Sequence, residues 1–233
     1  MATILCTICA RGGSKSVLNK NIRSLCGIPL FAHSLHHAEH SAIFTHIVFT
    51  SDSSEYCDLA RSHSFSQVFQ RSPELALDTS GKIPAIIDAL HKSENYFGCS
   101  YDYIFDLDCT SPLRIVSDIL DCYSFIQQPL VSNVITASPA RRSPYFNLIE
   151  RCPSTGRIYL SKTLPFNVLR RQDSPDCFDM NASIYAWKRE CLVTSTSLFL
   201  DSTHLHIMPE ERSLDIDNEL DFRLVEFLMG IRQ

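Results

Sequence analysis

The sequence predicts an α/β protein built on a mostly parallel, twisted β-sheet with helices on both faces. Short, fully apolar segments alternate along the chain with longer amphipathic segments, which is the pattern of buried parallel strands joined by helices. The chain has 233 residues, of which 45% are hydrophobic. That is enough for one large domain whose core needs neither a metal nor a disulfide. We therefore expect a single domain over residues 1–233.

The expected elements follow one another in order along the chain. The strands are Ile4–Cys9, His46–Thr50, Gln67–Phe69, Tyr103–Leu107, Val131–Ala137, Ser183–Trp187 and His204–Met208. The helices are Pro29–His40, Ser54–His63, Gly81–Tyr96, Ile115–Gln127 and Glu219–Ile231. Pro29 suits a first helical turn, and Asp217 or Asn218 can cap the last helix.

The alternation breaks over residues 138–175. This segment has no periodic apolar face, and it holds seven basic residues against two acidic ones. It is too long for an ordinary loop. It also carries many large apolar side chains, which are unfavourable in water. We expect an inserted dimerisation arm that buries these side chains against a second copy of the chain, which makes the protein a homodimer. The alternative is a lid that closes over the chain's own site.

Composition and charge limit the function classes. A net charge of −5 argues against a general nucleic-acid partner, and no apolar run reaches the ~20 residues of a membrane span. Nothing at the N-terminus has the form of a secretory signal, so we expect a cytoplasmic protein with ten reduced cysteines. Cys6 and Cys9 lie three apart on a strand, where they point to opposite faces and form no redox or zinc pair.

A basic, glycine-containing loop follows the first strand. It reads Ala-Arg-Gly-Gly-Ser-Lys from Ala10 and continues to Lys20-Asn21. Adjacent glycines let the backbone approach a ligand, and successive amides can form a nest for an anion. Arg11, Lys15 and Lys20 add charge for phosphate oxygens, although the spacing is not that of a Walker loop. The loop predicts a small anionic ligand, with a solvated basic turn as the alternative.

Two carboxylate pairs are candidate ligands for a hard cation. Asp106 and Asp108 end a strand, where ligands of open α/β sheets bind, and Asp215 and Asp217 precede the last helix. The alternatives are a turn residue for Asp108 and a helix cap for Asp217. Four histidines share one helix at the spacing of a metal site, but we expect them to form a solvated face: His33, His36, His37 and His40.

Five segments in order resemble the acylneuraminate cytidylyltransferases, the CMP-N-acetylneuraminate synthetase family. They are ARGGSKSVLNKN, RSPELALDTSGK, LDCTSPLR, FDMNASIYAW and SLDIDNELDF. The resemblance spans nearly the whole chain, and it implies a Rossmann-like nucleotidyltransferase fold with a dimerisation arm in mid-chain. The implied reaction joins CTP to a nine-carbon 2-keto sugar acid, giving a CMP-sugar and pyrophosphate.

The same resemblance assigns roles by position. The implied nucleotide contacts are Arg11, Gly12, Ser14, Lys15, Lys20, Asn21, Arg71 and Asp108. The implied catalytic groups are Arg11, Lys15, Lys20 and Asp217. Asn181 and Tyr185 match sugar contacts, with Arg170 as a looser match. Mg²⁺ is the implied cofactor, on Asp217 with Asp215 and Asp108.

One departure from the family pattern concerns the sugar. Asp108-Cys109-Thr110-Ser111-Pro112 stands where the sialic-acid enzymes carry Gln-Pro-Thr-Ser-Pro. A carboxylate there resembles the branch that acts on relatives such as legionaminic acid. Two alternatives stay open: another sugar nucleotidyltransferase, using 3-deoxy-octulosonate or a sugar 1-phosphate, and a nucleotide-binding protein without turnover.

Overall fold

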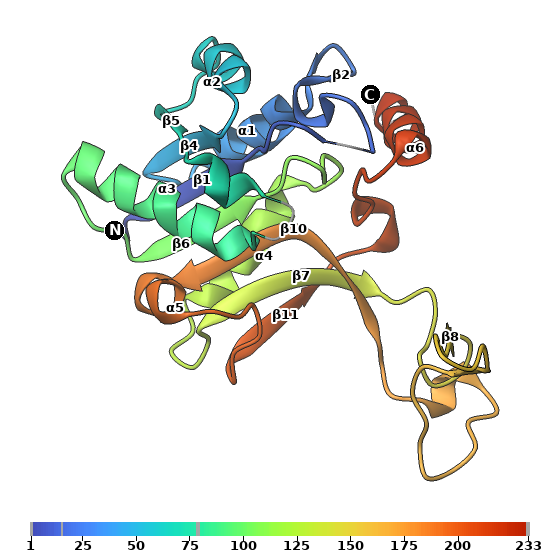
Figure 1. Cartoon of the computed structure of the whole chain (residues 1–233). Helices are drawn as coiled ribbons and strands as arrows, with labels where there is room; N and C mark the ends of the chain where they lie inside the picture. The colour runs from blue at the N-terminus through green and yellow to red at the C-terminus, as the bar shows by residue number, and fades with distance from the viewer. Residues whose placement is uncertain (1, 15, 78–79, 232–233) are drawn as a thin grey trace.

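Seven strands form one mixed sheet in the computed structural model, which describes residues 2–14, 16–77 and 80–231 (Figure 1). The strand order across the sheet is β11-β7-β10-β6-β1-β4-β5. In chain order the strands are β1 (Ile4–Cys9), β4 (His46–Ser51), β5 (Gln67–Gln70), β6 (Tyr103–Leu107), β7 (Asn133–Pro139), β10 (Phe178–Lys188) and β11 (Thr203–Ile207).

Most neighbouring strands in this sheet are parallel. β1 lies between β4 and β6 and runs parallel to both, and the β4–β5 and β7–β11 pairs are also parallel. β10 is the exception, because it pairs antiparallel with β6 on one side and with β7 on the other. The predicted fold class, an α/β protein with a mostly parallel sheet, is confirmed.

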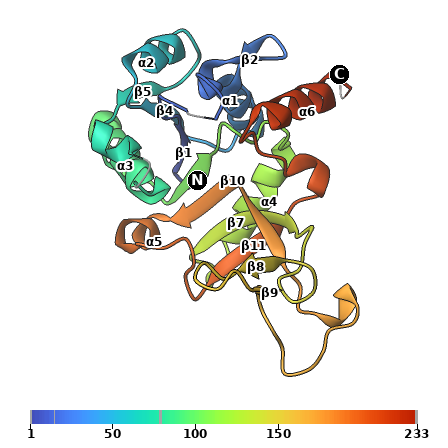
Figure 2. The ribbon, with the colours of Figure 1, turned by 45° about the vertical axis from the view of Figure 1, so that its right-hand side comes forward.

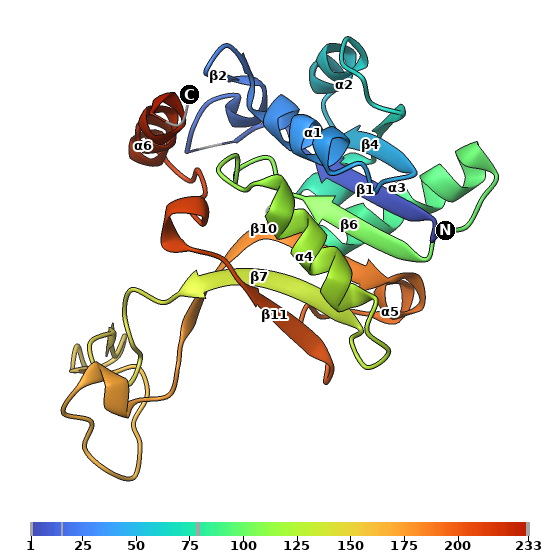
Figure 3. The same cartoon turned by 180° about the vertical axis from the view of Figure 1, so that it is seen from behind.

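Helices cover both faces of the sheet, as expected (Figures 1 and 3). α1 (Leu30–Ser41), α2 (Ser54–Arg61) and α4 (Val116–Ile126) pack in one hydrophobic cluster with the sheet. α3 (Lys82–Phe97) and α5 (Arg189–Thr194) pack on the other face. α6 (Glu219–Gly230) lies apart from the sheet, against the loop after β1 and residues near the start of α1.

The helix ends have local causes in the sequence. The Ser53 hydroxyl accepts the Tyr56 amide and caps α2, and Gly98 ends α3 in the left-handed conformation that suits glycine. Asn218 caps α6, because its side chain accepts the amides of Leu220 and Asp221. The cap of α6 is therefore Asn218 and not Asp217.

The predicted strands and helices are present, with shifted ends. β10 starts at Phe178, five residues before the expected start, as an extension of its ladder with β7. Three features were not predicted from the sequence: α5 and the two-stranded pairs β2 (Ser24–Leu25)–β3 (Ile28–Pro29) and β8 (Ile149–Arg151)–β9 (Ile158–Leu160). These elements are too short for a hydrophobic period to register.

The expected solvated histidine face is wrong for two of its members. His33 is only 8% exposed, and its Nε2 lies 2.9 Å from the carbonyl oxygen of Leu25. His37 is also largely buried: burial and the positive charge of Arg114 lower its pKa to about 3. The reason is that α1 packs against α4 and the loop after β1 as well as the sheet, so more than one of its sides is covered. No group of three or more potential metal ligands occurs among the described residues.

The segment 138–175 leaves the sheet between β7 and β10 as a projecting arm (Figures 1 and 2). It holds the β8–β9 hairpin, and the Arg171 guanidinium fastens its base by donating to the carbonyls of Ala140 and Arg141. Large apolar side chains are exposed along it: Phe146, Leu148, Ile149, Ile158, Tyr159, Phe166 and Leu169. The arm therefore lacks a core of its own.

All ten cysteines are free thiols in this fold. Cys6 and Cys9 belong to hydrophobic clusters on opposite faces of the sheet, as the strand geometry predicted. None of the helices in the described ranges is both long enough and apolar enough to cross a membrane.

Protonation of His37 is expected to weaken the fold in acid. The native state keeps this imidazole neutral down to about pH 3, whereas an unfolded chain protonates it near pH 6.5. Below pH 6.5 the unfolded state binds the extra proton, so the free energy of unfolding falls by ~1.4 kcal/mol per pH unit from this group. Above pH 6.5 the group contributes no pH dependence.

Urea unfolding at pH 7.5 and pH 5 measures this effect. His37→Gln should lose less stability between the two pH values than the wild type does. His40→Gln, on the exposed side of the same helix, should lose as much as the wild type. Equal acid sensitivity in His37→Gln and the wild type would contradict the assignment.

Candidate functional site

A cleft of about 400 Å³ opens at the carboxyl ends of β1 and β6. This is the edge at which open α/β sheets bind their ligands. Its walls come from the loop after β1, from residues 71–77 and 80–85, and from two loops that carry aspartates, one after β6 and one before α6. Its lining includes Cys9, Arg11, Ser14, Ser16, Lys20, Asn21, Arg71, Leu75, Ala76, Leu77, Ser80, Gly81, Lys82, Ala85, Asp108, Thr110 and Asp217.

Gly12 lets the loop after β1 lie against the end of β4. A Cβ atom on Gly12 would come within 3.1 Å of the Ser53 Cβ, which leaves no room for a side chain without movement. The Gly12 amide donates to Asp52 Oδ1 at 3.0 Å, and Gly13 adopts a positive φ of 68°. Gly12 thus shapes the loop and gives its own amide to Asp52 in this structure.

Cationic side chains collect on this side of the cleft. The Arg71 guanidinium is 5% exposed, its Nη2 lies 3.8 Å from Asp52 Oδ1, and its Nε has no hydrogen-bond partner among the described residues. Lys20 Nζ donates to the carbonyl of Ile216 and lies 3.8 Å from Asp217 Oδ1. With Arg11 also in the lining, this wall suits a ligand with several negative charges.

Asn21 adds a buried amide to the same wall. Its Nδ2 donates to the Arg11 carbonyl at 3.2 Å, which holds the loop in place. Its Oδ1 is buried and has no hydrogen-bond partner in the described part of the chain. Buried acceptors are normally satisfied, so Asn21 is suited to receive a donor from a ligand.

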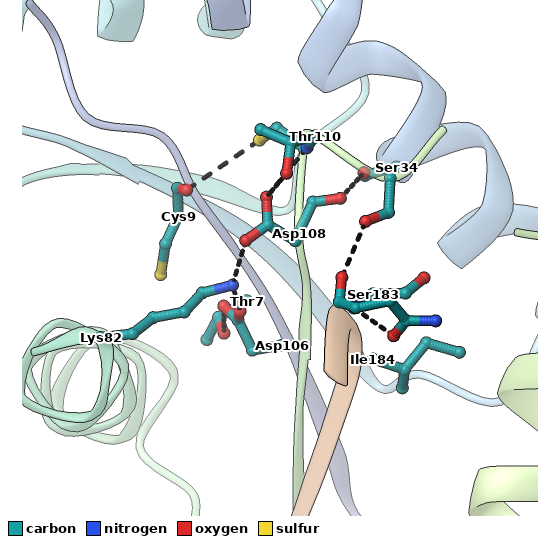
Figure 4. A network of polar contacts seen from close by, with 12 residues as sticks. Thr7, Cys9, Ser34, Lys82, Asp106, Asp108, Thr110, Ser183 and Ile184 are labelled. Carbon is teal, nitrogen blue, oxygen red and sulfur yellow. Dashed lines mark hydrogen bonds and ion pairs between the residues drawn. The ribbon is translucent and has the colours of Figure 1, made fainter. Parts of the chain in front are cut away.

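An ion cluster forms the floor of the cleft where β6 ends (Figure 4). Lys82, the first residue of α3, places its Nζ 2.6 Å from Asp106 Oδ2 and 2.6 Å from Asp108 Oδ2. Burial alone would raise the pKa of Asp108, but the Lys82 charge and hydrogen bond hold it well below the usual range. Burial alone would likewise lower the pKa of Lys82, but the two carboxylates raise it.

The loop after β6 is fixed by a buried guanidinium. Arg114 is 1% exposed and donates to the carbonyls of Asp108 and Ser111 and to the hydroxyl of Ser34. Asp108 also accepts the amide and hydroxyl of Thr110 on its Oδ1, so it is a turn residue as well as a wall of the cleft. Arg114 therefore holds the backbone of Asp108, and Thr110 holds its carboxylate.

The second pair of aspartates lies on a loop that is tied to the first. The Ile216 amide donates to the Thr110 carbonyl at 2.9 Å, which brings the Asp217 side of the chain to the cleft. Asp217 is 76% exposed. Burial, together with the charges of Asp217 and Asp108, raises the pKa of Asp215 to about 6. Carboxylates crowded in this way are stabilised by a cation.

These carboxylates fit a divalent ion that brings other ligands with it. The described residues hold no group of three or more His, Cys, Asp or Glu that would bind a metal unaided. Mg²⁺ is commonly held by one or two carboxylates together with substrate phosphates and water. Asp217, with Asp215 beside it, meets that requirement next to the basic wall.

Most of the predicted nucleotide residues meet in this cleft. Its lining contains Arg11, Ser14, Lys20, Asn21, Arg71, Asp108 and Asp217. Lys15 lies outside the described residues.

The predicted sugar residues do not line the cleft. Tyr185 is buried on β10, with its ring centre 5.2 Å from Lys82 Nζ. The Asn181 side chain is also buried and bonds Thr136 and Ser213. Arg170 lies on the arm and pairs with Asp173.

Two charged residues of the site, Lys82 and Asp52, were not predicted from the sequence. Lys82 is 26 residues from Asp108 in sequence, and Asp52 is 40 residues from Gly12. The sequence signal for Lys82 was its position at the start of a predicted helix. The helix dipole disfavours positive charge there, so a lysine at that position suggests a nearby negative partner. Asp52 directly follows β4, at the same sheet edge as the other site residues.

The fold and the cleft define an α/β protein with a basic cleft at the carboxyl ends of its parallel strands. A cytidylyltransferase family model matches residues 5–133, which is more than half of the chain. The chain belongs to the cytidylyltransferase family and is a nucleotidyltransferase.

Relatives of known name match over the full length. The chain is 47% identical to "Post-translational flagellin modification protein B" of Campylobacter coli, covering 98% of this chain and 96% of that protein. It is 44% identical to a CMP-N,N'-diacetyllegionaminic acid synthase of Campylobacter jejuni, covering 100% and 97%. The solved structure of CMP:2-keto-3-deoxy-manno-octonic acid synthetase with CTP superposes with a TM-score of 0.74 at 13% identity over the whole of both chains, a likeness of fold.

Arg212 is expected to hold the Asp215–Asp217 loop in place. Its guanidinium makes two bonds to the Asp118 carboxylate, of 2.8 and 3.1 Å. Asp118 is buried, so Arg212→Gln should cost roughly 2–4 kcal/mol in the free energy of unfolding. It should also weaken Mn²⁺ binding in the presence of CTP, because the carboxylates lose their anchor.

Arg189→Gln provides the matched control. Arg189 makes the same two-bond pair with Glu94, between α3 and α5, outside the cleft. Urea unfolding should show a loss of stability in both variants, whereas Mn²⁺ affinity should fall only in Arg212→Gln. Unchanged Mn²⁺ affinity in Arg212→Gln would show that the pair serves stability alone.

Proposed function

We propose that this cytidylyltransferase joins CTP to a nine-carbon 2-keto sugar acid of the legionaminic type, giving a CMP-sugar and pyrophosphate. The observation that carries the proposal is the full-length 44% identity to a CMP-N,N'-diacetyllegionaminic acid synthase. Asp108 at the end of β6, in place of the glutamine of the sialic-acid enzymes, supports the same branch.

The cleft offers two kinds of surface that suit the two parts of a nucleoside triphosphate. Leu75–Leu77 and Ala85 offer small and apolar surface to a base. Arg11 and Lys20 offer positive charge to phosphate oxygens. We place the triphosphate along the loop after β1, with Arg71 and Asn21 as further contacts.

The reaction needs positioning and charge neutralisation more than covalent chemistry. A hydroxyl of the sugar forms a bond to the α-phosphorus of CTP, the bond to pyrophosphate breaks, and the hydroxyl proton leaves to a base or to water. Arg11, Lys15 and Lys20 offset the charge that develops on the departing pyrophosphate. The ordered loops around Asp108 and Asp217 hold the reacting groups in line.

Mg²⁺ is the cofactor that the carboxylates suit. Asp217 would hold it, with Asp215 beside it, and the ion would neutralise charge on the phosphates. The assignment of Asp108 as a further ligand competes with its ion pair to Lys82.

For the sugar, we propose positioning roles for Tyr185, whose ring packs beside Lys82, and for Asn181, through Ser213. Arg170 does not line the cleft of its own chain, and the arm that carries it projects from the sheet (Figure 1), so we propose that it serves a neighbouring subunit.

We also propose that the arm over residues 138–175 forms a homodimer interface. Its exposed apolar side chains resemble half of a hydrophobic core, and burial against a second copy covers them.

Free thiols in a biosynthetic enzyme that consumes CTP agree with a cytoplasmic site of action.

The proposed reaction is tested by incubating the protein with CTP, Mg²⁺ and one sugar acid at a time. CTP should release pyrophosphate faster with N,N'-diacetyllegionaminic acid than with N-acetylneuraminic acid or 3-deoxy-octulosonate, and mass spectrometry should find the CMP conjugate of that sugar. CTP should raise the melting temperature more than UTP, GTP or ATP. If CTP releases no pyrophosphate with any of the three sugars, the proposal is refuted.

Asp217→Asn tests the metal-binding assignment. The change keeps the shape of the side chain and removes a charge, so we expect kcat to fall by ~100-fold or more while the fold persists. Asp201→Asn, in the exposed turn before β11, is the control and should keep the wild-type rate. A near-normal rate in Asp217→Asn would remove this residue from the site.

Light scattering tests the arm as a dimer interface. The wild type should have about twice the chain mass of 26.4 kDa. Leu169→Glu places a charge on the 80% exposed Leu169 of the arm and should give monomers. Leu130→Glu, at an equally exposed leucine between α4 and β7, should stay dimeric. A monomeric wild type would contradict the interface.

A further inference from the structure

Two carboxylates converge on a single point at the floor of the cleft. Asp106 is completely buried, and its Oδ1 accepts the Thr7 hydroxyl at 2.8 Å. Asp108 uses its Oδ1 for the amide and hydroxyl of Thr110, at 2.9 Å each. The remaining Oδ2 atoms of both aspartates therefore face the same place, and Lys82 Nζ occupies it at 2.6 Å from each (Figure 4).

Local helix energetics do not explain a lysine at this position. Lys82 is the first residue of α3, and a positive charge at a helix N-terminus is disfavoured by the helix dipole. Two buried or half-buried carboxylates this close to each other repel strongly unless a cation lies between them. The presence of a lysine at this position is explained by the two aspartates whose charge it neutralises.

We propose that Lys82 is a built-in cation that takes the place a second divalent ion would fill between Asp106 and Asp108. The cleft then works with one metal ion, held on the Asp217 side. The inference rests on the proposed function for the identity of that ion. Asp217 is 76% exposed and Lys20 Nζ lies 3.8 Å from its carboxylate, whereas Lys82 lies 2.6 Å from the carboxylate of Asp108, so Asp217 is the more open to a metal.

The arrangement also explains how the cleft tolerates a carboxylate at position 108. A triphosphate approaching Asp106 and Asp108 without a counter-ion would meet two negative charges. Lys82 removes one of them without a dissociable ion, so the floor stays partly neutralised at any metal concentration. Lys82 is thereby a positioning residue for Asp108 as well as a fixed charge.

Removal of the lysine should create a metal site. We would titrate Mn²⁺ alone into the protein, without nucleotide or sugar, and follow free Mn²⁺ by electron paramagnetic resonance. Lys82→Met should bind one more Mn²⁺ per chain than the wild type, and the double variant Lys82→Met/Asp108→Asn should return to the wild-type number. Lys92→Met is the control, since Lys92 pairs with Asp88 on the same helix outside the cleft. Equal binding by Lys82→Met and the wild type would overturn the proposal.

A second measurement does not depend on the folding of Lys82→Met. In the presence of CTP, Mn²⁺ should raise the melting temperature of the wild type and of Asp108→Asn, and the rise should be lost in Asp217→Asn. Loss of the rise in Asp108→Asn, its persistence in Asp217→Asn, or its absence from the wild type would each overturn the single-ion arrangement.

The Mn²⁺ titration and the sugar assay fail independently. If no CMP-sugar forms but Lys82→Met gains an ion, the proposed reaction is wrong and the role of Lys82 stands. If CMP-sugar forms and Lys82→Met gains no ion, the reaction stands and the role of Lys82 is wrong.

Discussion

This molecule depends on one constraint: buried charge must be neutralised where β1 and β6 end side by side. The parallel register sets Thr7 opposite Asp106, so the basic loop after β1 and the acidic end of β6 emerge next to each other. Lys82 reaches this point from α3, on one face of the sheet. Without that cation, two carboxylates would repel each other at the floor of the cleft. The charge balance of the cleft is therefore built into the sheet.

Two guanidinium groups hold in place the loops that surround this ion cluster. Arg114 holds the carbonyls of the loop after β6, and Arg212 holds the loop that carries Asp217 through the carboxylate of Asp118. Arg114 bonds backbone carbonyls and the Ser34 hydroxyl, and Arg212 bonds a buried carboxylate. A site whose charged groups are fixed before the ligand arrives spends little of its binding energy on ordering them. This suits a reaction that depends on positioning and charge more than on covalent chemistry.

Local patterns in the sequence were enough to predict the sheet, its main helices, and the basic and acidic loops of the cleft. Ser14, Asn21 and Arg71 were expected in the cleft only from the family resemblance. Fully apolar runs identify the strands, and loops that follow parallel strands meet at one edge. The partner of Asp108 was not predictable, because the contact joins residues on different elements. The burial of His37 was missed for a related reason: helical spacing shows one apolar face but not that a second side is covered. The residue that caps α6 could not be chosen from the sequence, because Asp217 and its neighbour Asn218 are equally suitable residue types.

Anomalous scattering from a crystal of the CTP–Mn²⁺ complex would locate the metal ion and Lys82 in one experiment. We expect one manganese peak per chain, at Asp217, with Lys82 still between Asp106 and Asp108. A manganese peak between Asp106 and Asp108, with the lysine displaced, would contradict this expectation.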